Sequence, residues 1–237
     1  MRKKLLALIL AVTFCVSMLP SVTYAGTWSQ YSRTKLTNNA YRGLKGDFKL
    51  PSIDAQYTST YEYNFITFEE WLTVNAAPDW FEIGYMDGAL DPENDGTTED
   101  YKGFYKAKSI DGNYWEAKLV KTATVGTRYT FTIVDVDAQN LWEIYIGSTY
   151  FGSFADSVDP YNGDFNYQGY EVSVEPGSAT PILNSTDITN QMFYSSTSGT
   201  YSWKNWSTGT VVTHNNNSWG LTASWSSADN KTTITKN

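Results

Sequence analysis

A short pattern recurs four times between residues 81 and 174: an aromatic residue, then a glutamate, then aliphatic or small residues in alternation. The four copies are Phe81-Glu82-Ile83-Gly84-Tyr85, Trp115-Glu116-Ala117-Lys118-Leu119, Trp142-Glu143-Ile144-Tyr145-Ile146 and Tyr170-Glu171-Val172-Ser173-Val174. Side chains alternate between the two faces of a β-strand, so each glutamate lies on the face opposite its aromatic neighbour. The pattern predicts strands with one apolar face, whose glutamates point away from a core.

Strand and turn signals fill the rest of the chain. Tyr, Trp, Thr and Val, which pack well on a pleated surface, dominate the periodic runs, and Gly, Asn, Asp and Pro separate them. The predicted strands are Tyr41–Leu50, Tyr61–Asn75, Trp80–Met86, Tyr101–Lys108, Tyr114–Val120, Arg128–Val136, Leu141–Ile146, Tyr150–Phe154, Gly169–Glu175, Gln191–Tyr194, Thr200–Trp206, Thr208–Thr213 and Trp219–Trp225. Short, regularly spaced strands without a convincing helix indicate an all-β, two-sheet antiparallel sandwich.

Residues 1–25 have the layout of a secretory signal peptide. A basic Arg2-Lys3-Lys4 precedes the apolar run Leu5–Leu19, and the small residue Ala25 suits cleavage. The apolar run is shorter than the roughly 20 residues of a membrane-spanning helix, so we expect removal of this segment and a secreted, extracellular protein. Residues 26–237 are then predicted to form one β-sandwich domain.

The composition narrows the chemistry of the mature chain. The only cysteine, Cys15, lies in the predicted leader, so thiol chemistry and disulfides are excluded. The leader holds three basic residues and no acid, so its removal takes the net charge from −8 to −11. Nucleic acid and anionic membranes are therefore poor partners. The single histidine, His214, excludes a three-histidine zinc site.

One hairpin carries a resemblance to a known fold family. Residues 126–133, Leu141–Gly147 and Tyr150–Ser153 resemble a hairpin of the concanavalin-like jelly rolls, in which a W-x-V-Y-I-x-G strand precedes a short strand with a Gly-Ser pair. The resemblance covers about 30 residues and implies that sandwich fold. It does not choose a function, because the same fold carries lectins, glycosidases, lyases and peptidases.

A second, weaker similarity joins four segments in chain order: Gly46–Pro51, Trp80–Gly88, Phe104-Tyr105 and Tyr170–Glu175. They resemble segments of the glutamic peptidases (eqolisins), secreted sandwiches that use a glutamine and a glutamate. In this resemblance Glu171 takes the place of the catalytic glutamate. The partner glutamine should follow the second segment, but residues 89–102 contain none, and Gln168 does not fill that position. The resemblance implies a relative of the fold that lacks the catalytic amide.

The four repeated glutamates, Glu82, Glu116, Glu143 and Glu171, are the candidate catalytic residues. Retaining glycosidases use two carboxyl groups about 5 Å apart, and inverting ones use a wider pair that leaves room for water. Neighbouring strands could supply such a pair on a sheet face with Trp and Tyr platforms. The alternative is that all four are ordinary outward-facing strand residues.

Two further segments are candidate binding sites. Asp91, Glu93 and Asp95 alternate ahead of a glycine, a spacing that suits oxygen ligands of Ca²⁺; a solvated acidic loop is the alternative. Tyr201, Trp203 and Trp206 belong to an aromatic-rich run that could stack on sugar rings, with core packing as the alternative. In a strand, Tyr201 and Trp203 share one face and Trp206 lies on the other.

Three functions remain open from the sequence. The favoured one is a secreted protein that binds a glycan or cell-wall polymer, because Trp and Tyr are abundant. The rival is a hydrolase, either a degenerate glutamic peptidase that uses Glu171 or a glycosidase that uses two of the repeated glutamates. A structural or matrix protein is the third. Hydrolysis predicts two acids within about 10 Å in a cleft, one of them with a raised pKa, whereas binding predicts exposed aromatic rows with dispersed carboxylates.

Overall fold

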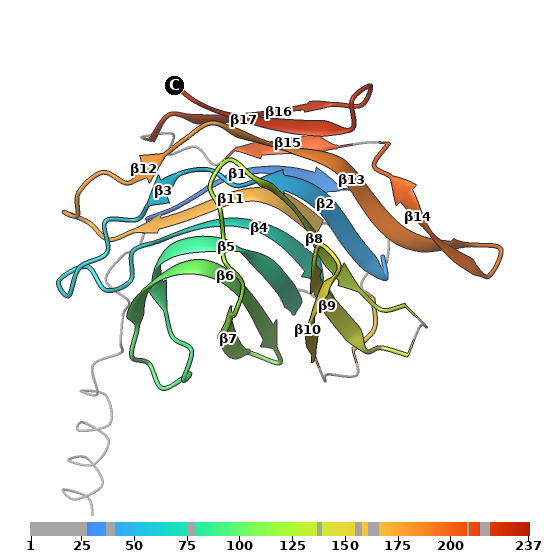
Figure 1. Ribbon diagram of the computed structural model, residues 1–237, viewed down its shortest axis with the longest axis horizontal. Coiled ribbons are helices and arrows are strands. Elements are labelled where there is room, and N and C mark those ends of the chain that lie inside the picture. Colours follow the sequence, from blue (N-terminus) through green and yellow to red (C-terminus); the bar gives the residue numbers. More distant parts are fainter. Residues whose placement is uncertain are drawn as a thin grey trace, which may run out of the picture.

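The computed structural model describes residues 28–36, 41–74, 79–136, 139–154, 158–160, 166–207, 209–213 and 219–237. In these ranges the chain is an all-β sandwich of two large antiparallel sheets, as the alternation predicted (Figure 1). The predicted leader, residues 1–25, and His214 lie outside the described residues. No helix within the described ranges is long and apolar enough to cross a membrane.

Within the described residues, sheet I has seven strands, in the order β15 (Thr210–Thr213), β1 (Trp28–Leu36), β11 (Asn166–Val174), β4 (Phe65–Thr73), β5 (Trp80–Leu90), β6 (Glu99–Ile110) and β7 (Asn113–Leu119). Sheet II, counted in the same way, has eight: β10 (Thr149–Phe154), β9 (Trp142–Ile146), β8 (Arg128–Val134), β2 (Gly43–Lys49), β13 (Thr186–Thr197), β17 (Lys231–Lys236) and β16 (Leu221–Ser226), with β14 (Thr200–Asn205) paired to β13. A small ribbon joins β3 (Ile53–Asp54) to β12 (Ile182–Leu183).

Four of these strands, β1, β3, β12 and β17, were not predicted, and β13 is longer than predicted. The most consequential is β1, which pairs with β11 on one side and β15 on the other. Its sequence, Trp28-Ser-Gln-Tyr-Ser-Arg-Thr-Lys-Leu36, has polar residues on both faces, so it lacks the apolar alternation that marks a half-buried strand. Pairing with its neighbours places it in the sheet.

The core lies between the sheets and contains the apolar face that the repeat predicted. Phe81, Trp142 and Tyr170 are fully buried, and Trp115 packs against the same cluster. The Phe81 ring stacks on Phe154 with centroids 4.4 Å apart, which joins β5 of sheet I to β10 of sheet II. The glutamate that follows each of these aromatic residues therefore faces away from this core.

A chain of buried polar side chains crosses the same interior. The Gln168 amide donates to Glu70 at 2.6 Å and accepts from Gln191 at 2.8 Å; Gln191 in turn accepts from Thr232 at 2.8 Å. Thr232 contacts Thr34 at 2.5 Å. These hydrogen bonds link sheet I to sheet II, and they place Gln168 on the face opposite Glu171, where it cannot act beside that carboxyl group.

Glu70 is neutral in this interior. Burial raises its pKa well above the ordinary value, and the hydrogen bond from Gln168 and the charge of Lys45 only partly oppose this. The space is tight, since a Cβ at Gly46 would come within 2.9 Å of Gln168 Oε1. A protonated carboxyl group avoids an unpaired charge in the sandwich.

The Glu70→Gln variant should gain thermal stability over the parent as pH rises. A carboxyl group whose folded pKa is raised stabilises the fold below its unfolded pKa and loses that contribution as pH rises through the folded pKa. Glutamine keeps the acceptor for Gln168 and never ionises. Melting temperatures between pH 4 and pH 8 check this, with the exposed Glu93→Gln as control. A constant difference across this range would contradict it.

Candidate functional site

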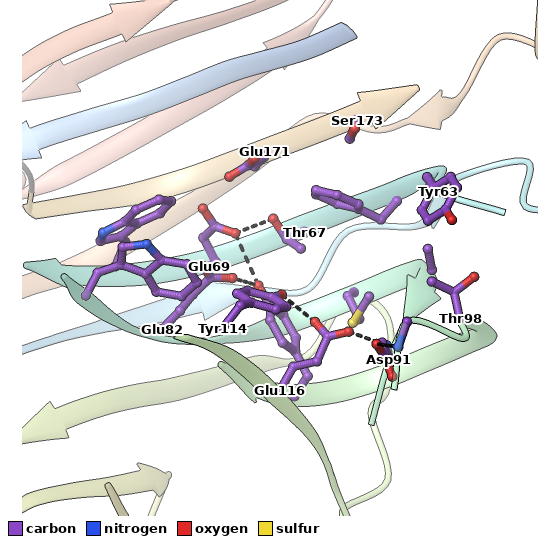
Figure 2. Close-up of a pocket in the computed structure, with 17 residues that line it drawn as sticks. Tyr63, Thr67, Glu69, Glu82, Asp91, Thr98, Tyr114, Glu116, Glu171 and Ser173 are labelled. Atoms are coloured by element: carbon purple, nitrogen blue, oxygen red, sulfur yellow. Dashed lines mark hydrogen bonds between the residues drawn. The ribbon is translucent and has the colours of Figure 1, made fainter. Parts of the chain in front are cut away.

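A cleft of about 350 Å³ opens on the face of sheet I that points away from the core. Strands β4, β5, β6, β7 and β11 contribute its floor, and the loop after β5 closes one end (Figure 2). Its lining is Tyr63, Phe65, Thr67, Glu69, Trp71, Trp80, Glu82, Met86, Ala89, Asp91, Gly96, Thr98, Tyr105, Tyr114, Glu116, Glu171 and Ser173. Three of the four repeated glutamates are among these residues.

Strand register arranges the carboxyl groups in a diagonal line. Glu171 on β11 lies opposite Thr67 of β4, and Glu69 is two residues further along β4. Glu82 on β5 lies opposite Trp71, two residues beyond Glu69. Because residues two apart share a face, Glu171, Glu69 and Glu82 follow one another across three adjacent strands.

Arg33 of β1 bridges the first two carboxyl groups. Its Nη2 donates to Glu69 and to Glu171, and two acceptors of one nitrogen lie at most about 6 Å apart. The guanidinium is 4 % exposed and lies over the rings of Trp71, at 5.0 Å, and Tyr167, at 5.3 Å. A buried cation that pairs with two carboxylates keeps negative charge at this end of the cleft.

Tyr105 joins Glu69 to Glu82. Its hydroxyl donates to Glu82 and lies 3.2 Å from Glu69 Oε2, and its ring lies against Gly84, where a Cβ would come within 2.8 Å of it. A tyrosine hydroxyl has one proton and can satisfy only one of the two carboxyl groups. A proton on one of the two carboxyl groups would let the Tyr105 oxygen or the other carboxyl group accept a further hydrogen bond.

The shifted pKa of Glu82 makes it the favoured position for that proton. Burial raises the pKa of Glu82 well above its ordinary value, and the charges of Glu69 and Glu171 and the hydrogen bond to Glu69 raise it further. Arg33 opposes this shift but lies against the other two carboxyl groups. The cleft thus combines an acid of raised pKa with two carboxyl groups that are ion-paired with Arg33, an asymmetry of the kind that acid–base catalysis uses.

Glu116 stands at the other end of the cleft. It accepts hydrogen bonds from the Tyr114 hydroxyl and from the backbone N–H of Asp91, as Figure 2 shows. Burial raises the pKa of Glu116, and the nearby Asp91 charge adds to the shift. Glu116 lies opposite Ala107, which also lies opposite Glu82, so a small residue separates the two side chains.

Aromatic rings flank the carboxyl groups. Trp71 and Trp80 pack with ring centroids 4.6 Å apart, and Tyr114 meets Trp80 edge-on at 5.9 Å. Tyr63 and Phe65 line the opposite end. Flat apolar faces next to hydrogen-bonding groups suit a ring-shaped, hydroxyl-bearing ligand such as a sugar.

The fourth repeated glutamate, Glu143, lies elsewhere. It belongs to β9 of sheet II and accepts a hydrogen bond from the Tyr145 hydroxyl at 2.7 Å. It does not line the cleft. The shared sequence pattern correctly indicates an outward-facing carboxylate, but pattern alone does not tell which sheet carries it.

Three important residues of the cleft were not singled out from the sequence: Arg33, Glu69 and Tyr105. Arg33 was missed because β1 was not predicted. A signal for Glu69 exists, since Phe68-Glu69 repeats the aromatic–glutamate step, with Phe68 fully buried. Tyr105 belongs to one of the segments that resemble the glutamic peptidases, but nothing in the local sequence indicated a role for its hydroxyl in the site.

The acidic loop after β5 does not gather the three carboxylates of the predicted calcium site. Asp91 accepts from the backbone N–H groups of Asp95, at 3.2 Å, and Gly96, at 2.7 Å, and Asp95 accepts from Thr97 at 2.8 Å. Glu93 is exposed. Among the described residues, no group of three or more His, Cys, Asp or Glu side chains is placed to hold a metal ion.

The predicted aromatic platform is only partly at the surface. Trp206 is 1 % exposed and packs in the core just after β14 ends, so its prediction as a sugar platform is wrong. Tyr201 and Trp203 are half-buried and pack on Tyr194, at 5.6 and 5.1 Å. The role of Tyr201 and Trp203 as sugar contacts stays a prediction.

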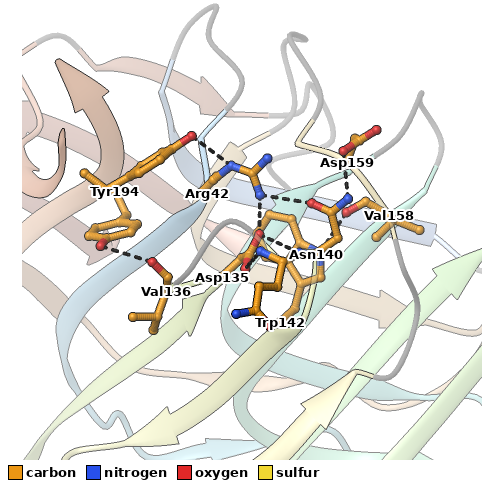
Figure 3. Close-up of polar contacts among 10 residues, drawn as sticks. Arg42, Asp135, Val136, Asn140, Trp142, Val158, Asp159 and Tyr194 are labelled. Atoms are coloured by element: carbon orange, nitrogen blue, oxygen red, sulfur yellow. Dashed lines mark hydrogen bonds and ion pairs between the residues drawn. The ribbon is translucent and has the colours of Figure 1, made fainter. Parts of the chain in front are cut away.

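A polar cluster holds this aromatic group in place. Arg42 donates to the Tyr201 hydroxyl at 3.1 Å, to Asn140 at 3.0 Å and to the buried Asp135 (Figure 3). The Asn140 side-chain amide in turn donates a hydrogen bond to Asp159 at 2.8 Å. The polar side chains of this cluster hydrogen-bond to one another. The cluster lies on sheet II, away from the cleft.

No known protein-family model matches the chain, and no curated protein matches it. The chemistry of the cleft is therefore argued from its own residues: a buried carboxyl group of raised pKa, two carboxyl groups ion-paired with a buried arginine, and several aromatic rings.

Replacing Arg33 with methionine should reduce the free energy of unfolding by about 3–5 kcal/mol at pH 7, because it leaves buried carboxylates without their cation. The matched Arg128→Met removes an exposed partner of Asp187 and should change stability by about 0–1 kcal/mol. Urea unfolding of both variants checks this. Equal losses would show that the Arg33 pairs contribute no more than a surface ion pair.

Proposed function

We propose that this protein hydrolyses glycosidic bonds in a glycan chain that lies in the cleft. The observation that carries the proposal is the buried Glu82, with its raised pKa, in the same cleft as Glu69 and Glu171, which pair with Arg33. Glycoside hydrolysis needs this pair of states, an acid that donates a proton and a carboxylate that acts as base or nucleophile.

Glu82 is the general acid. As the glycosidic C–O bond breaks, its proton passes to the leaving oxygen. Glu171 is the second carboxylate: its side chain is 15 % exposed, lines the cleft and is ion-paired with Arg33. Glu69 is fully buried and touches both Arg33 and Tyr105, so it is a positioning residue that keeps the proton on Glu82.

The spacing favours inversion at the anomeric carbon. Along β4, the partners of Glu171 and Glu82 are Thr67 and Trp71. Four residues of a strand span about 13 Å of backbone, and the Arg33, Glu69 and Tyr105 side chains connect the two carboxyl groups in series. This arrangement fits the wider pair of inverting enzymes better than the about 5 Å pair of retaining ones. In the inverting reaction, a water adds to the anomeric carbon and gives its proton to Glu171.

A sugar fits the cleft better than a peptide does. A glutamic peptidase needs an amide beside its glutamate, but the described residues that line the cleft include no Gln or Asn, and Gln168 points into the sandwich. Trp71 and Trp80 offer stacking surfaces for sugar rings. The sandwich is compatible with the concanavalin-like family suggested by the hairpin, and that relationship remains part of the proposal.

Binding without hydrolysis is the rival function, and the same aromatic wall supports it. The gathering of Glu69, Glu82 and Glu171 favours hydrolysis, because a binding surface has no use for an acid of raised pKa. A polymer outside the cell would suit the leader predicted at residues 1–25, since polysaccharides do not enter the cytoplasm intact.

Glu82→Gln and Glu171→Gln should each lower kcat on a hydrolysed polysaccharide by about 10²–10⁴-fold, the range for loss of a general acid or base. The control is Glu143→Gln, the repeated glutamate of sheet II, which should keep parental activity. Reducing-end release from a panel of polysaccharides measures kcat, and NMR of the first product reports its anomeric configuration.

The pH profile adds a second check. Activity requires Glu82 protonated and Glu171 ionised, so it should fall as pH rises through the raised pKa of Glu82. If glycans bind but none is hydrolysed, the protein is a binding module. If no glycan binds, the results favour the structural or matrix function. Equal losses in Glu82→Gln and Glu143→Gln would remove Glu82 from catalysis.

A further inference from the structure

The cleft is strongly one-sided in charge. Five carboxyl groups line it, and the described lining includes no lysine or arginine. The five are Glu69, Glu82, Asp91, Glu116 and Glu171. Arg33, beneath the surface on β1, forms ion pairs with Glu69 and Glu171.

Among the described residues, no lysine or arginine forms an ion pair with Asp91 or Glu116 at the other end. Asp91 raises the pKa of Glu116 by its charge, after the larger effect of burial, and no basic group acts on Glu116 in the opposite direction. Lys118, two residues further along β7, is ion-paired with Glu99 and lies over the Tyr101 ring. Two carboxyl groups thus face the same space without a partner of opposite charge.

Hydrogen bonds leave acceptor capacity at this end. Each oxygen of Glu116 accepts one hydrogen bond, from Asp91 N–H or from Tyr114, whereas a carboxylate offers about four lone-pair sites. Trp80 and Tyr114 border the same space. A ligand with a positive group on a flat ring would satisfy both features, the carboxyl pair by charge and the rings by stacking.

We propose that this end of the cleft binds the protonated amino group of an amino sugar, so that the substrate is a glycan with free amines. The inference rests on the proposed glycan binding and names its ligand class. A metal ion fits less well, because no group of three or more ligating side chains occurs among the described residues. A uronate-bearing glycan would bring a like charge to Asp91 and Glu116.

Binding of chitosan oligosaccharides and of their fully N-acetylated counterparts tests the inference. Calorimetry on the Glu82→Gln variant, in which hydrolysis is suppressed, should give at least about tenfold tighter binding of the free amine, since one charge-assisted contact contributes on that order. The preference should shrink as salt screens the charges.

Glu116→Gln identifies the subsite. On the same background it should weaken the free-amine ligand about tenfold and leave the acetylated ligand nearly unchanged. The matched Glu143→Gln should change neither. Melting temperatures confirm that each variant is folded, so a change in preference is not a loss of structure.

The outcomes separate this inference from the proposed hydrolysis. Equal binding of both ligands, or equal weakening of both by Glu116→Gln, overturns the amine subsite, whether or not neutral polysaccharides are hydrolysed. Tight amine binding that depends on Glu116, without turnover of any glycan, supports the subsite and overturns hydrolysis instead.

Discussion

The contact of Arg33 with Glu69 and Glu171 is the interaction on which the cleft depends. Three carboxyl groups on adjacent strands would repel one another at this degree of burial. The Arg33 guanidinium pairs with two of them, and the raised pKa of the third, Glu82, favours its neutral form. Both features reduce the repulsion, and both are used by the proposed chemistry. The stability of the cleft and its proposed function thus depend on the same electrostatic arrangement.

The central strands of sheet I are polar on both faces. On β4, Glu69 faces the cleft and Glu70 faces the interior. On β1, Arg33 is on the cleft side and Thr34 faces the interior. The interior chain from Glu70 to Thr34 lies directly behind the carboxyl groups of the cleft and ties sheet I to sheet II. This arrangement supports, from behind, the strands β1, β4 and β11 that carry Arg33, Glu69 and Glu171, and the proposed chemistry benefits from such rigid positioning.

The periodicity was sufficient to predict the sandwich and the outward direction of the repeated glutamates, because both follow from alternation along a single strand. The periodicity did not predict features that depend on which strands pair in the folded protein. β1 has no apolar face, and its place between β11 and β15 comes from hydrogen bonding to them. Arg33 was missed with it. Trp206 illustrates the opposite error, since abundance of aromatic residues does not tell which ring is buried.

The sequence by itself determined the all-β architecture and the face on which each repeated glutamate lies, because these are local consequences of side-chain direction. Only the tertiary structure decided which glutamates meet. Glu82, Glu116 and Glu171 belong to strands that share one sheet, whereas Glu143, with the same local pattern, belongs to the other. Strand order and register arise from contacts between residues far apart in the chain, and the raised pKa of Glu82 arises from the burial, and then from the neighbouring charges, that these contacts produce.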